Sequence, residues 1–145
     1  MMRAKRLAFA ATMLAAGLAV SPARADDFYE ARLRNGEQAL AAGRTREAVD
    51  NLRVASFGLL EKPSLLLASL ATLAVAQTRA GRTADAEATL QRFQAAQAIF
   101  PSTAEIRIAP DVRSAFETLA RQKIPGWNSS APVARKTPAP GSESR

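Results

Sequence analysis

The segment AGRTREAVDNL at Ala42–Leu52 returns in modified form as AGRTADAEATL at Ala80–Leu90, 38 residues further along the chain. In both copies a glycine is followed by Thr after two residues, Ala after five, Leu after nine and Pro after 20. The matched positions are Gly43, Thr45, Ala48, Leu52 and Pro63 in the first copy, and Gly81, Thr83, Ala86, Leu90 and Pro101 in the second. Five features repeated at one offset predict a structural unit that occurs twice.

The sequence around the two copies has the apolar periodicity of α-helices. The expected helices span residues 27–42, 45–61, 65–80, 83–100 and 111–123. Four of these helices have one apolar face. The faces are Tyr29, Leu33, Gly36 and Leu40 in the first helix; Ala48, Leu52, Ala55 and Leu59 in the second; Ala86, Leu90, Phe93 and Phe100 in the fourth; and Val112, Phe116 and Leu119 in the fifth. Between Leu65 and Ala76 only Ser69 and Thr72 are polar, so the third helix is expected at the centre of the fold. The sequence therefore predicts an all-α protein.

The repeated segments also predict how the helices begin and end. Gly43 and Gly81 are expected to end the first and third helices in the left-handed conformation. Thr45, Ser64 and Thr83 are expected to cap the N-termini of the second, third and fourth helices, and Pro63 and Pro101 to close the second and fourth. The repeated small Ala allows two antiparallel helices to approach closely, and the repeated Leu fills the space one turn further on.

The repeated pattern resembles the tetratricopeptide repeat family, whose motif combines small residues, a turn glycine, a large apolar residue and a closing proline. The corresponding residues are Gly36, Gly43, Ala48, Leu52, Ala55 and Pro63 in one copy, and Ala74, Gly81, Ala86, Leu90 and Pro101 in the other. The resemblance implies a right-handed stack of two helical hairpins, with the fifth helix as a C-terminal cap. The family's period is about 34 residues, whereas the repeat here is 38 residues long. The positions that are aromatic in the first helix of the family's motif are occupied here by Arg32 and Ala39 in the first copy, and by Leu70 and Gln77 in the second.

The same resemblance implies that a protein partner binds on the concave face formed by the first helix of each hairpin. The partner-binding residues carried over are Glu30, Leu33, Glu37, Leu40 and Arg79, with Ala41, Ala68, Ala71, Val75 and Thr78 as further groove positions. The alternative is that the residues of the third helix belong to the core. We favour this alternative for Ala71 and Val75.

Two repeats are few for a stacked architecture, in which each unit buries its apolar face against a neighbour. The fifth helix can cover the fourth with Phe116 and Leu119, but nothing covers the first helix, which carries Tyr29. We therefore expect self-association or docking on a larger partner. Trp127 either anchors the C-terminal tail to the domain or binds something else.

Residues 1–25 have the layout of a cleaved secretory signal peptide. Arg3, Lys5 and Arg6 precede an apolar run, and the stretch ends on a small-x-small triplet at Ala23–Ala25. The alternative is an uncleaved membrane anchor, but the apolar run of 14 residues is shorter than the roughly 20 that a spanning helix needs. We expect cleavage after Ala25, a periplasmic or secreted protein, and no stable membrane insertion afterwards.

The mature chain is close to electrically neutral. The whole sequence has 20 basic and 13 acidic residues, and four of the basic ones lie in the expected signal peptide. The remaining excess lies mostly in the segment 128–145, which is rich in Pro and Ser and is expected to be a disordered tail. The helical domain is thus expected at 26–127. Because no clustered basic face is evident, we expect no nucleic-acid partner.

The chain contains neither His nor Cys. The absence of His removes the most common general base and the most common metal ligand. The acidic pairs Asp26/Asp27 and Asp85/Glu87 lie in expected first turns of helices, where carboxylates are electrostatically favoured. We therefore expect no catalytic residue, no metal and no cofactor.

From the sequence we expect an exported adaptor that binds a protein or peptide in the cell envelope. The alternative is a structural or accessory subunit of an envelope complex, with permanently buried interfaces. Two further alternatives are binding to the cell wall or to nucleic acid through the basic tail, and an enzyme that uses only Asp, Glu, Lys, Ser or Arg.

Overall fold

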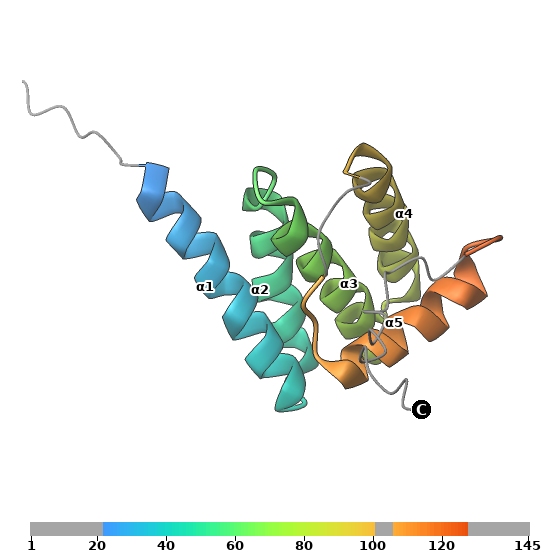
Figure 1. Ribbon diagram of the computed structural model, residues 1–145. Helices are drawn as coiled ribbons and strands as arrows, with labels where there is room; N and C mark the ends of the chain where they lie inside the picture. The colour runs from blue at the N-terminus through green and yellow to red at the C-terminus, as the bar shows by residue number, and fades with distance from the viewer. Residues whose placement is uncertain (1–21, 101–105, 128–145) are drawn as a thin grey trace, which may run out of the picture.

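The computed structural model describes residues 22–100 and 106–127, with side chains from Asp26 onward, and within these ranges the fold is all-α. The helices are α1 (Pro22–Ala41), α2 (Thr45–Gly58), α3 (Pro63–Arg79), α4 (Thr83–Ile99) and α5 (Pro110–Lys123). In Figure 1, α1 to α4 lie side by side in chain order, and α5 crosses the lower ends of α3 and α4. The expected tail 128–145, Pro101 and the expected signal peptide up to residue 21 lie outside the described residues.

The two repeated segments form two turns of the same geometry. Gly43 and Gly81 both have φ of 74°, as the sequence predicted. The glycine N–H groups donate to Leu40 and Thr78 at 3.1 and 3.0 Å, and the N–H groups of Arg44 and Arg82 donate to Ala39 and Gln77, both at 2.8 Å. These paired bonds are a Schellman motif, which satisfies carbonyls left free at a helix end. The sequence repeat therefore corresponds to one helix-ending turn that occurs twice.

The helix starts after these turns differ from the prediction. Thr45 and Thr83 are the first helical residues, and the N-cap positions belong to Arg44 and Arg82, which make no side-chain cap hydrogen bond. The reason is that the Schellman turn leads directly into the next helix: the carbonyls of Arg44 and Arg82 already accept from Ala48 and Ala86, both at 3.0 Å. The arginine side chains pair with acidic residues instead, Arg44 with Glu47 at 3.3 Å and Arg82 with Asp85 at 2.6 Å.

Pro63 also has a different role from the one expected. Helix α2 ends at Gly58, three residues before its predicted end, and Pro63 is the first residue of α3. The N-cap of α3 is Lys62, not Ser64 as the sequence predicted. Proline suits this position because the first N–H groups of a helix have no partner inside the helix. At the other end of the chain, α1 begins at Pro22, five residues before the predicted start.

Helix α3 lies at the centre of the fold, as its apolar sequence predicted. Every residue from Leu66 to Gln77 is buried, and α3 packs against α2, α4 and α5. Its polar side chains have partners: Ser69 donates to the carbonyl of Leu52 at 3.3 Å, and Thr72 donates to that of Ala68 at 2.8 Å. Gln77 accepts a hydrogen bond from Thr89 of α4 at 2.8 Å. These bonds allow buried polar groups at little cost.

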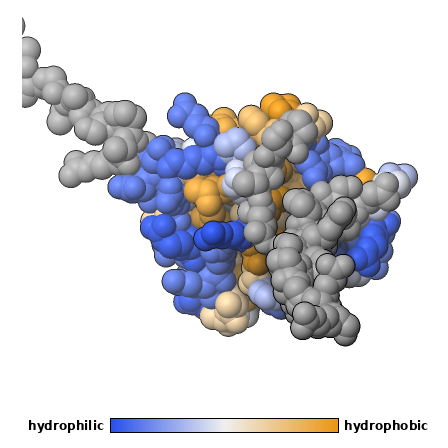
Figure 2. All heavy atoms as spheres, viewed as in Figure 1, coloured by the Kyte–Doolittle hydropathy of each residue, from blue (hydrophilic) through white to orange (hydrophobic). Residues whose placement is uncertain are grey.

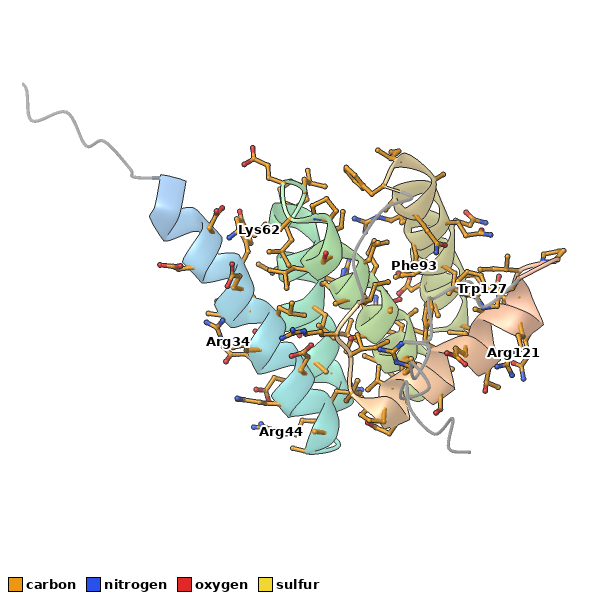
Figure 3. All side chains as sticks on the ribbon, in the orientation of Figure 1. Arg34, Arg44, Lys62, Phe93, Arg121 and Trp127 are labelled. Atoms are coloured by element: carbon orange, nitrogen blue, oxygen red, sulfur yellow. The ribbon has the colours of Figure 1, made fainter. Side chains whose placement is uncertain are left out.

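Glycines allow α1 and α2 to approach closely. A Cβ atom added to Gly36 would lie 2.6 Å from Cγ of Leu52, and one added to Gly58 would enter the ring of Tyr29. Ala48 and Leu52 are themselves fully buried. Lys62 adds an ionic link, since its Nζ lies 2.7 Å from Glu30 and 3.1 Å from Asp26 of α1 (Figure 3). Both bonds raise the pKa of Lys62.

Helix α5 is joined to the second hairpin by aromatic rings. Phe116 lies 4.8 Å from Phe93 of α4, and Trp127 lies 6.1 Å from Phe93 and 5.8 Å from Phe116, measured between ring centroids. Figure 3 shows Phe93 and Trp127 next to each other. Lys123 pairs with Glu87 of α4 at 2.7 Å. Trp127 was expected either to anchor the C-terminal tail to the domain or to bind something else. The structure shows that its ring packs on the domain, against Phe93 and Phe116.

None of the helices within 22–100 and 106–127 has the length and apolar character needed to cross a membrane.

Candidate partner-binding site

A groove runs between α1 and α3 and is bounded on its third side by the segment that leads into α5. The hollow measures about 450 Å³. It is lined by Glu37, Gln38 and Ala41 of α1, Thr72 of α3, Arg107–Ala109, and Asp111 and Val112 of α5. Figure 1 shows the extended segment before α5 running along α3 on the side that faces α1. Figure 2, from the same side, shows apolar surface beside the hydrophilic surface of α1. We call this hollow the groove.

Glu37 is the ionisable side chain of the groove whose environment is most altered. It is half-buried, and partial burial raises its pKa above the ordinary value of 4.5, while the charge of Arg34 lowers it by a smaller amount. Among the described residues Glu37 forms no ion pair or side-chain hydrogen bond. A carboxylate that is partly removed from water and has no partner favours the approach of a cation.

The segment at the edge of the groove is held by two arginines. Arg113 donates from Nη2 to the carbonyl of Ile106 at 2.9 Å. Arg79 pairs with Asp111 at 3.5 Å, which links the end of α3 to the first turn of α5. Asp111 is favoured there because the N-terminus of a helix carries partial positive charge. The extended segment 106–109 is thereby fixed at both ends.

The five residues predicted to bind a partner do not lie together. Leu33 and Leu40 are core residues with exposed fractions of 5% and 2%, so neither presents a surface to a partner. Glu30 is not part of the groove and pairs with Lys62 and Arg34. Glu37 lines the groove, and Arg79 reaches it only through Asp111.

The further groove positions divide in the same way. Ala68, Ala71 and Val75 are at most 2% exposed, so the core interpretation of Ala71 and Val75 is correct. Thr78 is exposed and donates to the carbonyl of Ala74 at 2.9 Å. Ala41 lines the groove. Of the ten positions carried over from the family pattern, Glu37 and Ala41 line the groove.

Sequence reasoning did not place residues 106–109 in the groove. The signal is the alternation of Ile106, Arg107 and Ile108, which is typical of an extended segment with one apolar face. Both isoleucines are partly buried against the core, whereas Arg107 is exposed. Which helices the segment crosses depends on tertiary contacts that the alternation does not specify.

The described residues contain no group of three or more His, Cys, Asp or Glu side chains that could hold a metal ion. The groove presents the half-buried carboxylate of Glu37 beside apolar side chains. A scan of protein-family models and searches of curated proteins and of solved structures find no match to this chain. What the described residues define is an all-α protein of two helical hairpins and a fifth helix.

Proposed function

We propose that this protein is an exported, non-catalytic adaptor similar to tetratricopeptide repeat proteins. The two hairpins are the units of a right-handed stack, α5 is its C-terminal cap, and a segment of a protein partner binds in the groove. The proposal includes cleavage of residues 1–25 and a location in the periplasm or outside the cell. N-terminal sequencing of the protein from its native host should give Asp26 as the first residue, and an uncleaved chain would contradict this part of the proposal.

The observation that carries the proposal is the groove between the first helices of the two hairpins. It contains a half-buried carboxylate, Glu37, that is unpaired among the described residues. Its hollow of about 450 Å³ falls within the usual size of ligand sites, about 300–1,000 Å³. The recurrence of the same Schellman turn at Gly43 and Gly81 supports the repeat interpretation. These features suit a partner segment that inserts a Lys or Arg side chain.

A photo-cross-linking residue at Gln38 tests this proposal in the native host, since Gln38 is exposed and lines the groove. We expect one dominant adduct, which is lost when Glu37→Lys is added because a cationic partner side chain would then meet a positive charge. Glu47→Lys is the control, as it makes the same charge change at an exposed site of α2. A cross-linker at Gln122, exposed on α5, should not give this adduct.

The second candidate function is a structural subunit of an envelope complex. The exposed apolar residues of the helical domain, among them Phe57 at 74% and Ile99 at 70%, favour it because they suit a permanent interface. A stoichiometric complex that survives both Glu37→Lys and Arg79→Glu would support this function. That result would contradict the adaptor proposal.

A further inference from the structure

A second hollow lies on a different part of the surface and shares no residue with the groove. It measures about 450 Å³ and is lined by residues of three helices: Phe28 and Tyr29 of α1, Arg53, Val54 and Phe57 of α2, and Arg92 of α4. We call it the arginine-flanked hollow. The adaptor proposal does not use it.

The apolar side chains of this hollow are unusually exposed. Phe28 is 47% exposed, Val54 39% and Phe57 74%. Single apolar residues on a surface are ordinary, but several that gather around one hollow are typical of an interaction site. Tyr29 lies beneath them, packed on the core and in edge contact with Phe28 at 5.3 Å.

Within the described part of the chain, the two arginines of the hollow lack acidic partners. Neither Arg53 nor Arg92 has a carboxylate within 4.0 Å among the described residues, whereas Arg44, Arg82 and Arg121 each pair with a carboxylate three or four residues away in the chain. Asp50 precedes Arg53 by one turn but forms no ion pair with it in the described part of the chain. Nearby, Arg32 lies over the ring of Phe28 at 5.0 Å and donates to Asn51, which is neutral. The hollow is therefore apolar inside and positively charged at its edge.

We propose that the arginine-flanked hollow binds an acidic segment of a partner protein. One apolar side chain of that segment lies between Phe28, Val54 and Phe57, and flanking carboxylates contact Arg53 and Arg92. Arginine suits this role because its planar fork pairs bidentately with carboxylates. Together with the groove, this surface would let one adaptor hold two partners, but the inference stands without the groove.

Charge argues against two other occupants. In a two-fold dimer through this hollow, the same patch of both copies would meet, and the arginines of one copy would come close to those of the other. An anionic membrane would attract the arginines. However, a concave surface does not insert readily into a flat lipid surface, whereas it can receive a side chain of a partner. An acidic, apolar peptide satisfies both the shape and the charge.

The test uses the purified chain and two fluorescein-labelled peptides, Asp-Glu-Asp-Phe-Glu-Asp and the same peptide with Ala in place of Phe. Fluorescence anisotropy should show saturable binding of the Phe peptide and much weaker binding of the Ala peptide. The double variant Arg53→Glu/Arg92→Glu should weaken binding of the Phe peptide at least about tenfold, because attraction becomes repulsion. All the substituted side chains are exposed, so circular dichroism should stay unchanged.

The control variant is Arg46→Glu/Arg121→Glu, which makes the same change in net charge at exposed positions outside the hollow. Its affinity should stay within about twofold of the unmodified chain if the contact is local. Glu37→Lys should also leave binding of the Phe peptide unchanged, which separates this inference from the groove. Failure of the groove cross-link with intact peptide binding would overturn only the adaptor proposal.

Three results would overturn the inference. The first is no saturable binding of the Phe peptide up to about 1 mM. The second is a dimer, seen by sedimentation and abolished by Phe57→Glu, which would assign the hollow to a second copy. The third is flotation with vesicles of phosphatidylglycerol that is lost in Arg53→Glu/Arg92→Glu while the peptide does not bind.

Discussion

At the scale of single residues, Glu37 carries the chemistry of the groove. Burial raises its pKa, which means that the folded protein binds this proton more tightly than the unfolded chain does. The ionised form therefore lowers the free energy of unfolding above the folded pKa. This cost disappears as the pH falls below the ordinary glutamate pKa of 4.5, where both states are protonated.

Replacing this carboxylate with an amide should stabilise the protein at neutral pH. We expect Glu37→Gln to raise the Tm at pH 7, and the gain to shrink as the pH falls through the folded pKa, measured by circular dichroism from pH 7 to pH 4. Glu61→Gln, at an exposed glutamate between α2 and α3, is the control measured in parallel. A gain of equal size at both ends of the range would mean that the stabilisation has another cause.

At the scale of structural elements, the two Schellman turns make a quantitative comparison possible. Gly43 and Gly81 have the same φ, and a Cβ atom added at either position would meet nothing within 4 Å. Only backbone strain therefore opposes a side chain at these sites. Because the two turns are equivalent, the same substitution should have nearly the same cost in both.

We expect Gly43→Ala and Gly81→Ala each to lower the free energy of unfolding by about 1–2 kcal/mol, the cost of the left-handed conformation for an L-residue. Asn tolerates this conformation better, so Gly43→Asn and Gly81→Asn should cost less than the alanine variants. Urea unfolding followed by circular dichroism measures all four. Costs that differ widely between the turns would contradict their structural equivalence.

The helix boundaries show where sequence reasoning succeeded and where it did not. The turn glycines were predictable because few residues other than glycine adopt positive φ readily. Pro63 was misassigned because proline is suitable both after one helix and in the first turn of the next. The capping roles of Thr45 and Thr83 were wrong because the composition of a turn does not show that the preceding residue already occupies the N-cap.

At the scale of the whole molecule, α5 packs on the second hairpin through α3 and through aromatic contacts with α4. Phe116 is 4% exposed, and truncation of a buried Phe typically costs about 3–5 kcal/mol. We expect Phe116→Ala to lower the free energy of unfolding by about that amount. Trp127 contacts the Phe116 ring, so its emission should shift to longer wavelength in this variant because water reaches the indole. The signal is specific, since Trp127 is the one tryptophan of the sequence.

The control for this prediction is Thr118→Ala, which truncates an exposed residue of the same helix. Thr118 donates only to the carbonyl of Ser114 one turn earlier, so its loss should change stability little. Urea unfolding read by Trp127 fluorescence and by circular dichroism gives both values. An unshifted emission in Phe116→Ala would show that the Trp127 ring stays shielded from water without the Phe116 ring.

Most of the architecture was predictable from sequence, and most of the candidate site was not. The all-α fold and the central α3 follow from local periodicity, which each segment carries by itself. The groove depends on where residues 106–109 run, and Leu33 and Leu40 were assigned to a binding face although both are buried. The arginine-flanked hollow joins residues of α1, α2 and α4, and such a combination is defined only by tertiary packing.

The order of helix contacts also has a consequence for how fast the chain folds. Successive helices pack on each other from α1 to α4, so most contacts link nearby parts of the sequence. Low contact order of this kind accompanies folding in microseconds to milliseconds. The exception is α5, which packs on α3 and must wait until α4 has turned back along it. We therefore expect α5 to dock last, as a slower step than formation of the two hairpins.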